Sequence, residues 1–403
     1  MSARRVLFFA EAVSLAHVAR PVRLAESLDN SWDIHFALAN EYRNFLSKRD
    51  WTIHTVDSVQ PIQFLRRLQR GAPLFSTEEL ERSVTADLRL IESTKPDVVV
   101  GDFRLSLAVS ARLAKVPYVA ICNAHWSPWS KLTDFPSPDI SILNAFGPRL
   151  ANLLFRIGRP AAFWLHTLPI NRIRRQFGLQ PYRDIRFAYT DGDLSLYADT
   201  PYLVPTKALP DSHRYLGPIL WAPQGSLPGW WNKLTASDRL AYVTLGSTGR
   251  ADLLPMALRA CENHGLTTIV ATAGRADVTG HETRHVADFL PGDQAAERAA
   301  VVVCNGGSAT VYQALSKGTP VVGICSNLDQ FLTMHYVSRA GAGVGLRASS
   351  ADQNAIKAAI VRATSESSVN AAKRVQDDFA RFPIENRFPL ELQRCIDRVR
   401  PVA

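Results

Sequence analysis

Short apolar runs alternate with helical patterns through the first third of the chain. Residues 6–10 and 96–101 are apolar runs of strand length, and residues 34–39 and 117–121 predict two further strands. Apolar residues recur three or four positions apart in two intervening segments, 19–28 and 105–114, which predicts helices. This alternation predicts a doubly wound parallel α/β sheet, with ligands at the C-terminal ends of its strands.

The same alternation returns near residue 240. Here the pattern predicts strands at 240–245, 267–271, 285–290, 301–304 and 319–324, and helices at 253–262, 351–363, 369–379 and 390–399. A segment dense in Pro, Gly and Trp, residues 216–234, predicts a linker between the two sets. We therefore expect two Rossmann-like domains, residues 1–218 and 219–403, facing each other across a cleft, with the last helix free to pack back on the first domain.

Residues 126–181 interrupt this rhythm with aromatic and basic side chains, among them Trp126, Trp164 and Arg175. We expect an inserted set of helices. They could be amphipathic helices that pack on the domain, or they could form an acceptor pocket or a membrane-facing surface.

Composition narrows the class of protein. The 403 residues are 46% hydrophobic, enough for two cores, and Lys and Arg exceed Asp and Glu by nine charges. That excess suits an anionic ligand or an anionic membrane surface, and no nucleic-acid motif accompanies it. The five cysteines are scattered and form no paired motif, so we expect neither a structural zinc site nor disulfides. This favours a protein of the cytoplasm, which could also associate with the inner face of the membrane. The apolar N-terminal run meets Glu11 at once, as in a buried strand rather than a signal peptide.

A glycine turn follows the strand at 301–304. Asn305, Gly306, Gly307, Ser308, Ala309 and Thr310 lie between this strand and a helical pattern. A strand, a glycine turn and a helix together direct backbone N–H groups at an anion, and the hydroxyl groups of Ser308 and Thr310 add donors. The turn predicts a phosphate site.

Two further polar positions follow strand ends of the second half. Asp329 and Gln330 follow the strand at 319–324, and we expect a loop there whose carboxylate and amide bind sugar hydroxyl groups. Gly246 and Ser247 follow the strand at 240–245 and could contact donor phosphates. Together with the glycine turn, they predict a nucleotide-sugar site.

His17 and Asp102 are the candidate catalytic pair of the first half. Each follows a predicted strand, so both are expected at the same edge of the sheet. A carboxylate beside an imidazole fixes its tautomer and stabilises the imidazolium that forms when it accepts a proton. No G-x-S-x-G motif accompanies the pair, so hydrolase chemistry of that kind is not indicated. His17 could equally be a histidine at a helix start without a catalytic role.

Residues 301–346 resemble the C-terminal signature of the UDP-glycosyltransferase-like superfamily, the inverting GT-B enzymes that include macrolide and flavonoid glycosyltransferases. The matching features are the glycine turn, Gln313 on the following helix and the Asp329–Gln330 pair. Residues 289–291 resemble the segment that lies against the donor base. His17 and Asp102 match the first half more loosely.

The resemblance implies the role of each residue. His17 would be the general base and Asp102 its partner, in an N-terminal domain that binds the acceptor. In the C-terminal domain, the donor would be bound by Gly246, Ser247, Leu290, Asn305, Gly306, Gly307, Ser308, Ala309, Thr310, Gln313, Asp329 and Gln330. The family's phosphate-contacting histidine is Asn305 here, and its acidic ribose ligand is Gln313, so the nucleotide, UDP or dTDP, stays open.

The implied reaction moves a hexosyl group from a nucleotide diphosphate sugar to a hydroxyl of an apolar small molecule or lipid, in natural-product or glycolipid biosynthesis. The donor is a co-substrate, and neither a cofactor nor a metal is expected, because a helix N-terminus neutralises the leaving diphosphate. Two alternatives remain: a nucleotide-sugar epimerase or hydrolase on the same fold, and a non-catalytic partner protein that binds nucleotide sugars.

Overall fold

The computed structural model describes residues 4–46, 49–222, 227–235, 239–246 and 248–399. The chain divides into two compact units. The first comprises Met1–Thr133, Ile157–Ile219 and Phe382–Ala403, and the second comprises Asp134–Arg156 and Leu220–Arg381. The division between Ile219 and Leu220 lies beside the boundary that the Pro- and Gly-rich segment predicts.

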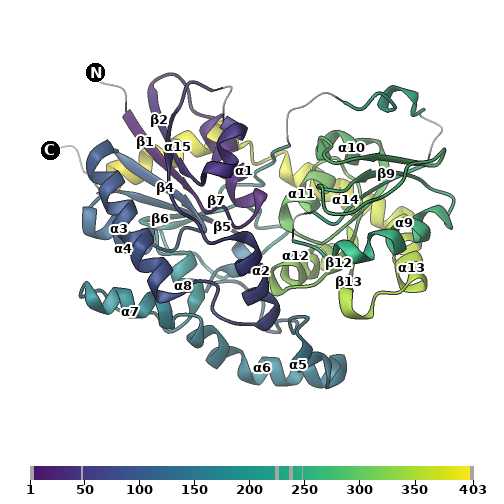
Figure 1. The fold of residues 1–403 in the computed structure, drawn as a ribbon, viewed down its shortest axis with the longest axis horizontal. Coiled ribbons are helices and arrows are strands. Elements are labelled where there is room, and N and C mark those ends of the chain that lie inside the picture. The colour runs from purple at the N-terminus through teal and green to yellow at the C-terminus, as the bar shows by residue number, and fades with distance from the viewer. Residues whose placement is uncertain (1–3, 47–48, 223–226, 236–238, 247, 400–403) are drawn as a thin grey trace. The chain divides into compact units, whose positions relative to one another are not determined.

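A parallel sheet forms the centre of the first unit (Figure 1). Among the described residues its seven strands run in the spatial order β3 (Thr52–Thr55), β2 (Trp32–Leu38), β1 (Arg4–Ala10), β4 (Val98–Asp102), β5 (Tyr118–Cys122), β6 (Leu194–Tyr197) and β7 (His213–Tyr215). The strand order reverses between β1 and β4. In doubly wound folds the crevice at that reversal, outside the C-terminal ends of the strands, is where ligands bind.

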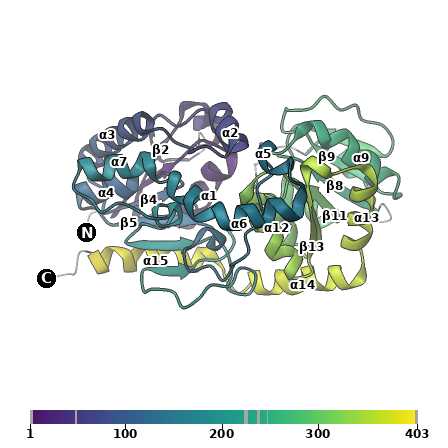
Figure 2. The ribbon, with the colours of Figure 1, turned by 90° about the horizontal axis from the view of Figure 1, so that it is seen from below.

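Helices cover both faces of this first sheet. Leu7, Phe9 and Val99 form one core with α3 (Thr77–Thr94) and α4 (Leu107–Ala114). The alternate residue Phe8 points to the other face and contacts Phe388 of α15 (Ile384–Val399). Figure 2 shows α4 and α15 on opposite sides of the sheet. The described residues of this unit also form α1 (Leu15–Ala25), α2 (Pro61–Arg70), α7 (Leu168–Gln176), α8 (Ile185–Tyr189) and the C-terminal half of α6 (Gly147–Leu165).

The second unit repeats this order of strands. Within its described residues, six parallel strands run β10 (Arg284–Ala287), β9 (Thr267–Ala271), β8 (Leu240–Thr244), β11 (Ala299–Cys304), β12 (Val321–Cys325) and β13 (Gly343–Arg347). One face packs on α9 (Leu254–Glu262) and α13 (Gln353–Ala363). The other side of the sheet carries α10 (Gly292–Arg298), α11 (Ser308–Ser316), α12 (Leu328–Arg339) and α14 (Glu366–Phe379), as Figure 1 shows. The strand order reverses between β8 and β11.

Residues 134–156 group with the second unit, although the predicted boundary places them in the first. Asn152 accepts a hydrogen bond from the Ser137 amide, and Arg347 at the end of β13 donates to the Ser137 carbonyl at 2.9 Å. Asp139 accepts from the Ser349 amide at 2.8 Å. Side chains far apart in the sequence make these bonds, so no local composition signal marks them.

The inserted region is helical, as predicted. It contains α5 (Ser141–Asn144), α6 (Gly147–Leu165) and α7. Among the described helices of the whole chain, none is both long and apolar enough to cross a bilayer.

The prediction of a loop at Asp329 and Gln330 is wrong. Both residues lie in the first turn of α12, where the Asn327 side chain caps the helix by accepting from the Gln330 amide at 3.1 Å. An Asn followed three residues later by Gln is a helix-start signal, so the sequence carried the information. His17 likewise lies inside the first turn of α1 rather than before a helix.

Candidate active site

His17 and Asp102 come together in the first unit, beside the reversal of strand order. Asp102 ends β4 and pairs in register with Ala10, the last residue of β1, and α1 begins five residues later. The His17 Nδ1 atom lies 2.7 Å from Asp102 Oδ1. The carboxylate side chain is completely buried, whereas a fifth of the His17 side chain is exposed. The His17 imidazole therefore contacts a buried carboxylate on one side, and its exposed side is accessible to a ligand.

The hydrogen-bond distances favour a proton on one ring nitrogen. Asp102 also accepts from the Arg20 guanidinium, with Nε 2.6 Å from Oδ2 and Nη2 2.7 Å from Oδ1. His17 Nδ1 lies 2.7 Å from Asp102 Oδ1 and 3.1 Å from Arg20 Nη2, which can only donate. The shorter contact is to a carboxylate oxygen, which accepts, so it favours a proton on Nδ1. In the neutral imidazole the lone pair then sits on Nε2, the nitrogen that can accept a proton.

Arg20 is a site residue that the sequence analysis missed. It lies three residues after His17, on the same face of α1, and only a tenth of its side chain is exposed. Its Nη1 also donates to Asn123 Oδ1 at 2.9 Å, and Asn123 donates to the buried carboxylate of Asp199. The positive charge of Arg20 thus compensates the negative charge of Asp102, and its two hydrogen bonds fix the orientation of the carboxylate that contacts His17.

Phe103 supports the other face of the histidine. Its ring stacks on the His17 imidazole with the ring centroids 4.8 Å apart and the planes 15° apart. The Phe103 backbone has φ = 60°, which is a strained conformation for a residue with a bulky side chain. The strain persists because the residues on either side are held, Asp102 by Arg20 and Arg104 by a second ion-pair network.

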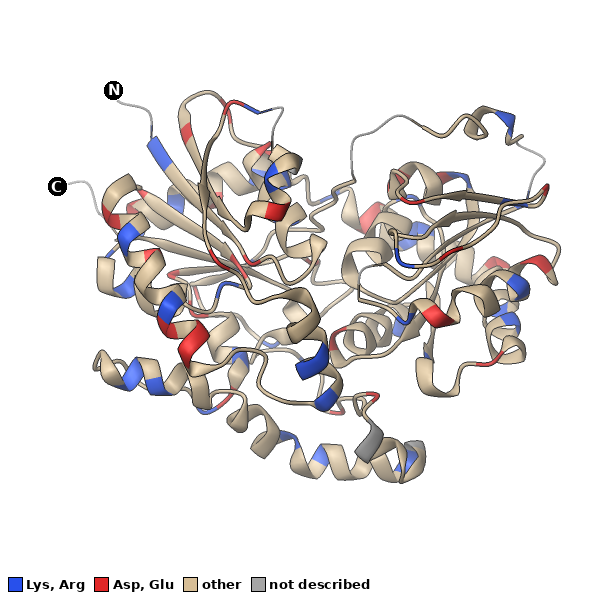
Figure 3. Ribbon diagram, viewed as in Figure 1, with Lys and Arg blue, Asp and Glu red and all other residues tan. Residues whose placement is uncertain are grey.

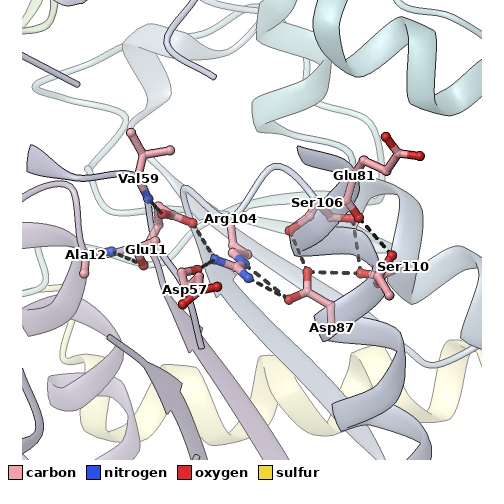
Figure 4. Close-up of polar contacts among 11 residues, drawn as sticks. Glu11, Ala12, Asp57, Val59, Glu81, Asp87, Arg104, Ser106 and Ser110 are labelled. Carbon is pink, nitrogen blue, oxygen red and sulfur yellow. Dashed lines mark hydrogen bonds and ion pairs between the residues drawn. The ribbon is translucent and has the colours of Figure 1, made fainter. Parts of the chain in front are cut away.

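That second network is buried beside the site (Figure 4). Arg104 pairs with Glu11 at 2.8 Å and with Asp87 at 2.9 Å, and all three side chains are almost completely buried. Burial by itself lowers the pKa of the Arg104 guanidinium, but the negative charges of Asp87 and Glu11 outweigh this and raise it above its ordinary value. Glu11 follows β1 and Arg104 follows β4, so the network ties the two strand ends on either side of the reversal.

An aromatic wall continues from Phe103. Three further rings contact Phe103: Phe64 of α2 edge-on at 6.0 Å, Phe75 at 5.6 Å and Tyr189 of α8 at 5.5 Å. Tyr189 in turn contacts Trp126 at 5.5 Å. Of these residues the sequence analysis singled out only Trp126. The wall gives the surroundings of His17 an apolar, aromatic character.

The glycine turn of the second unit has the strained backbone that requires glycine. Gly306 has φ = 78°, and a Cβ atom there would lie 2.7 Å from Cys325 Sγ and 2.8 Å from Met334 Cγ. Gly307 is the N-cap of α11, and Ser308, Ala309 and Thr310 form the first turn of that helix. Because glycine has no side chain, the N-cap residue itself makes no side-chain cap hydrogen bond to α11, and a helix start of this kind suits an anion.

The turns after β8, β11 and β12 meet at Thr248. Its Oγ1 accepts from Asn305 Nδ2 at 3.1 Å and from Gln330 Nε2 at 3.4 Å. Asn305 also accepts from the Gly307 amide at 3.1 Å. Thr248 was not predicted. Its neighbour Ser247, which was, lies outside the described residues.

Arg275 brings a positive charge to the same turns. Its Nη1 donates to the carbonyl of Gly246 at 2.9 Å and to that of Gly249 at 3.0 Å. Gly246 has φ = 59° and lies beside Asn305. Arg275 follows β9 by four residues, and the sequence analysis did not single it out, because only the folded sheet brings the ends of β8 and β9 together.

The remaining predicted donor residues differ in how accessible they are. Gln330 is buried, and its Oε1 accepts from the Ser326 amide at 2.8 Å, whereas Asp329 is half-buried. The Leu290 side chain is buried, so only its backbone could face a ligand. Gln313 donates to the Trp221 carbonyl and lines a pocket of about 270 Å³. The residues that line this pocket are Leu220, Trp221, Ala222, Asp293, Gln313, Ser316 and Lys317.

Comparison with known proteins identifies the family. Residues 268–392 match the family model of the C-terminal domain of erythromycin biosynthesis protein CIII-like proteins. The chain is 46% identical over 397 residues to a PGL/p-HBAD biosynthesis rhamnosyltransferase of Mycobacterium bovis, covering 98% of this chain and 88% of that protein. The chain belongs to the UDP-glycosyltransferase-like superfamily.

Two further matches agree with this assignment. A PGL/p-HBAD biosynthesis glycosyltransferase of Mycobacterium tuberculosis is 44% identical over 388 residues, covering 94% of this chain and 90% of that protein. The solved structure of the spinosyn rhamnosyltransferase SpnG complexed with thymidine diphosphate superposes with a TM-score of 0.68 at 17% identity, covering 97% of this chain and all of that one. The protein is thus a glycosyltransferase with the two Rossmann-like domains of the GT-B fold, as predicted.

Proposed function

We propose that this glycosyltransferase transfers a hexosyl group from a nucleotide diphosphate sugar to a hydroxyl of an apolar acceptor with inversion at the anomeric carbon. The first unit supplies the base and the second binds the donor. The observation that carries the proposal is the 2.7 Å contact between His17 Nδ1 and the buried carboxylate of Asp102. This contact leaves Nε2 as the proton acceptor.

In the proposed reaction His17 Nε2 takes the proton of the acceptor hydroxyl. The oxygen attacks the anomeric carbon from the side opposite the leaving group, and the bond between that carbon and the diphosphate oxygen breaks. The nucleoside diphosphate leaves with the bonding electron pair. Asp102 stabilises the imidazolium, because the negative charge of its buried carboxylate lies against the Nδ1–H group.

The leaving diphosphate carries negative charge that the second unit can neutralise. The N-terminus of α11 supplies partial positive charge, and Arg275 supplies a full one. Arg275 would replace the charge that is lost because Asn305 stands where the family has histidine. These groups support a proposal that the transfer needs no metal, so turnover should persist in excess EDTA.

The sugar and nucleotide are proposed from the relatives. One is a rhamnosyltransferase by name, and SpnG was solved with thymidine diphosphate. We therefore propose a dTDP-activated rhamnosyl donor as the first to test, with the UDP-sugars second. The aromatic wall formed by Phe64, Phe75, Phe103 and Tyr189 favours an acceptor with an apolar or aromatic surface beside the reacting hydroxyl.

The test combines a donor panel with a base variant. Thermal shift with dTDP, UDP and GDP selects the nucleotide, and release of nucleoside diphosphate with and without a phenolic acceptor measures transfer. His17→Ala should lose at least a hundredfold in kcat while keeping the nucleotide affinity, and His281→Ala, a half-exposed histidine of the second unit, is the matched control. Unchanged turnover of His17→Ala would refute the base. Equal turnover without acceptor would indicate a hydrolase or an epimerase, and no turnover with any donor would favour a non-catalytic binding protein.

A further inference from the structure

Large apolar side chains lie exposed along α6. Ile157 is 71% exposed and Leu153 50%, and the other members of the group are more than a third exposed. We call this group the α6 apolar stripe: Leu150, Leu153, Leu154, Ile157, Trp164 and Leu165. Isolated exposed apolar residues are common, but a row of six on one helix usually marks an interaction surface.

The spacing of these residues places them on one side of the helix. At about 100° per residue, they fall within an arc of roughly 120° around the helix axis. Ala151, Phe155 and Phe163 fall on the opposite side and are buried. The helix is therefore apolar on two faces. One face packs on the protein, and the other faces solvent.

Arginines border the stripe. Arg149 and Arg156 lie on one edge of it, about 40° to 60° from its nearest members. The helix contains no Asp or Glu, and Figure 3 shows blue but no red along it. Arg156 approaches Asp134 at 3.6 Å, but both side chains are mostly exposed, so the pair neutralises little of this charge.

We propose that the α6 apolar stripe and its arginine border dock the protein on an anionic membrane surface. Apolar side chains on one face of a helix enter the boundary between headgroups and acyl chains, and adjacent arginines pair with lipid phosphates. Two observations favour a membrane over a protein partner. The stripe is a convex row along a helix rather than a concave site, and the charged residues of the helix itself are all arginines. None of the residues of the stripe or its border takes part in the proposed reaction, so the two proposals can be tested independently.

The test is co-sedimentation of the full-length protein with vesicles of phosphatidylcholine, with and without 30% phosphatidylglycerol. We expect binding to the anionic vesicles and at least tenfold weaker partitioning of the Leu153→Ser/Ile157→Ser variant. Arg149→Gln/Arg156→Gln should lose most of the difference between the two lipid compositions. Val361→Ser/Leu390→Ser, which removes two equally exposed apolar residues elsewhere, is the matched control and should bind like the original protein.

Three results would overturn the proposal. The protein could fail to sediment with anionic vesicles, or the control variant could lose as much binding as the stripe variant. Alternatively, sedimentation velocity could show a dimer that Leu153→Ser/Ile157→Ser dissociates, which would make the stripe a contact between copies of the chain. Nucleotide affinity measured by calorimetry checks that each variant is folded. Donor binding with no vesicle binding would reject this proposal alone.

Discussion

Replacing Asp102 by Asn tests both the tautomer of His17 and the buried ion pair. The carboxylate accepts three hydrogen bonds, one from His17 and two from Arg20, at 2.6 to 2.7 Å. The amide introduced by Asp102→Asn has one oxygen and one NH₂ group where the carboxylate has two oxygens. Its NH₂ group, a donor, must therefore face the donor of either His17 or Arg20. With NH₂ toward His17, Nδ1 has to accept, the proton moves to Nε2, and the base is lost.

Two magnitudes follow from this geometry. Loss of a general base costs about 10²–10⁴ in rate, so we expect kcat to fall about 10³-fold, which corresponds to about 4 kcal/mol. Removing one partner of a buried ion pair costs about 3–5 kcal/mol. Because a tenth of the Arg20 side chain stays exposed, we expect Asp102→Asn to lower the free energy of unfolding by an amount at the lower end of this range, about 3 kcal/mol.

The assay separates the two effects with a matched variant. Asp87 is also completely buried and pairs with an arginine, Arg104, but it does not contact His17. Asp87→Asn should therefore destabilise the protein by a similar amount in urea denaturation. Arg104 keeps its ion pair with Glu11 and so still holds Phe103 against His17, and kcat should stay within about threefold when rates are normalised to folded protein. The reasoning is refuted if Asp102→Asn keeps more than a third of the original kcat, or if Asp87→Asn loses as much rate as Asp102→Asn.

Three further predictions concern the glycine turn, its cation and a buried histidine. Gly306→Ala should weaken nucleoside diphosphate binding at least tenfold by calorimetry, because the new Cβ atom would collide with two side chains. The control is Gly265→Ala, a position of similar φ with open space around it, which should keep the original affinity. Equal losses of affinity in the two variants would contradict the prediction. Arg275→Met should weaken the same affinity about tenfold, which corresponds to the loss of one charge-assisted hydrogen bond. Arg259→Met, which changes an exposed arginine, is the control and should leave the affinity unchanged. Unchanged affinity in Arg275→Met would show that Arg275 does not contact the nucleotide. Burial lowers the pKa of His213 from 6.5 to about 4, so on acidification the unfolded chain binds a proton before the folded protein does. The contribution of the neutral His213 to the free energy of unfolding is therefore fully present above pH 6.5 and should fall by about 3 kcal/mol as the pH drops to 4. His213→Gln should flatten this decline in urea denaturation, and a slope equal to that of the original protein would show that His213 does not cause it.

Much of the fold was predictable because a buried parallel strand leaves a strong local signal. Residues 98–100 and 301–303 are uninterrupted valine and contribute to strands buried on both faces. Of the missed elements, β3 and α2 have weak patterns: β3 is four residues long and half exposed, and α2 buries only Phe64, which contributes to the aromatic wall. The helix α3 was also missed, although it begins with a capping box and buries a regular apolar face.

The sequence by itself determined the residues that stand at strand ends. His17, Asp102 and the glycine turn could be found there because the ends of parallel strands meet at one edge, and because two adjacent glycines after a strand indicate a close approach of the backbone. Arg20 was within reach of the same reasoning, since a residue three positions after His17 shares its helix face.

Only the tertiary structure decided how these residues are supported. Thr248, Arg275 and Phe75 reach the two sites from neighbouring strands, turns and helices, and nothing in their local sequence distinguishes them from surface residues. The same holds for α6, whose apolar positions left open whether the helix packs on the domain, forms an acceptor pocket or faces a membrane. An amphipathic period shows that a helix has an apolar face, but only packing shows whether the protein covers that face or leaves it to solvent, because coverage depends on segments distant in the chain.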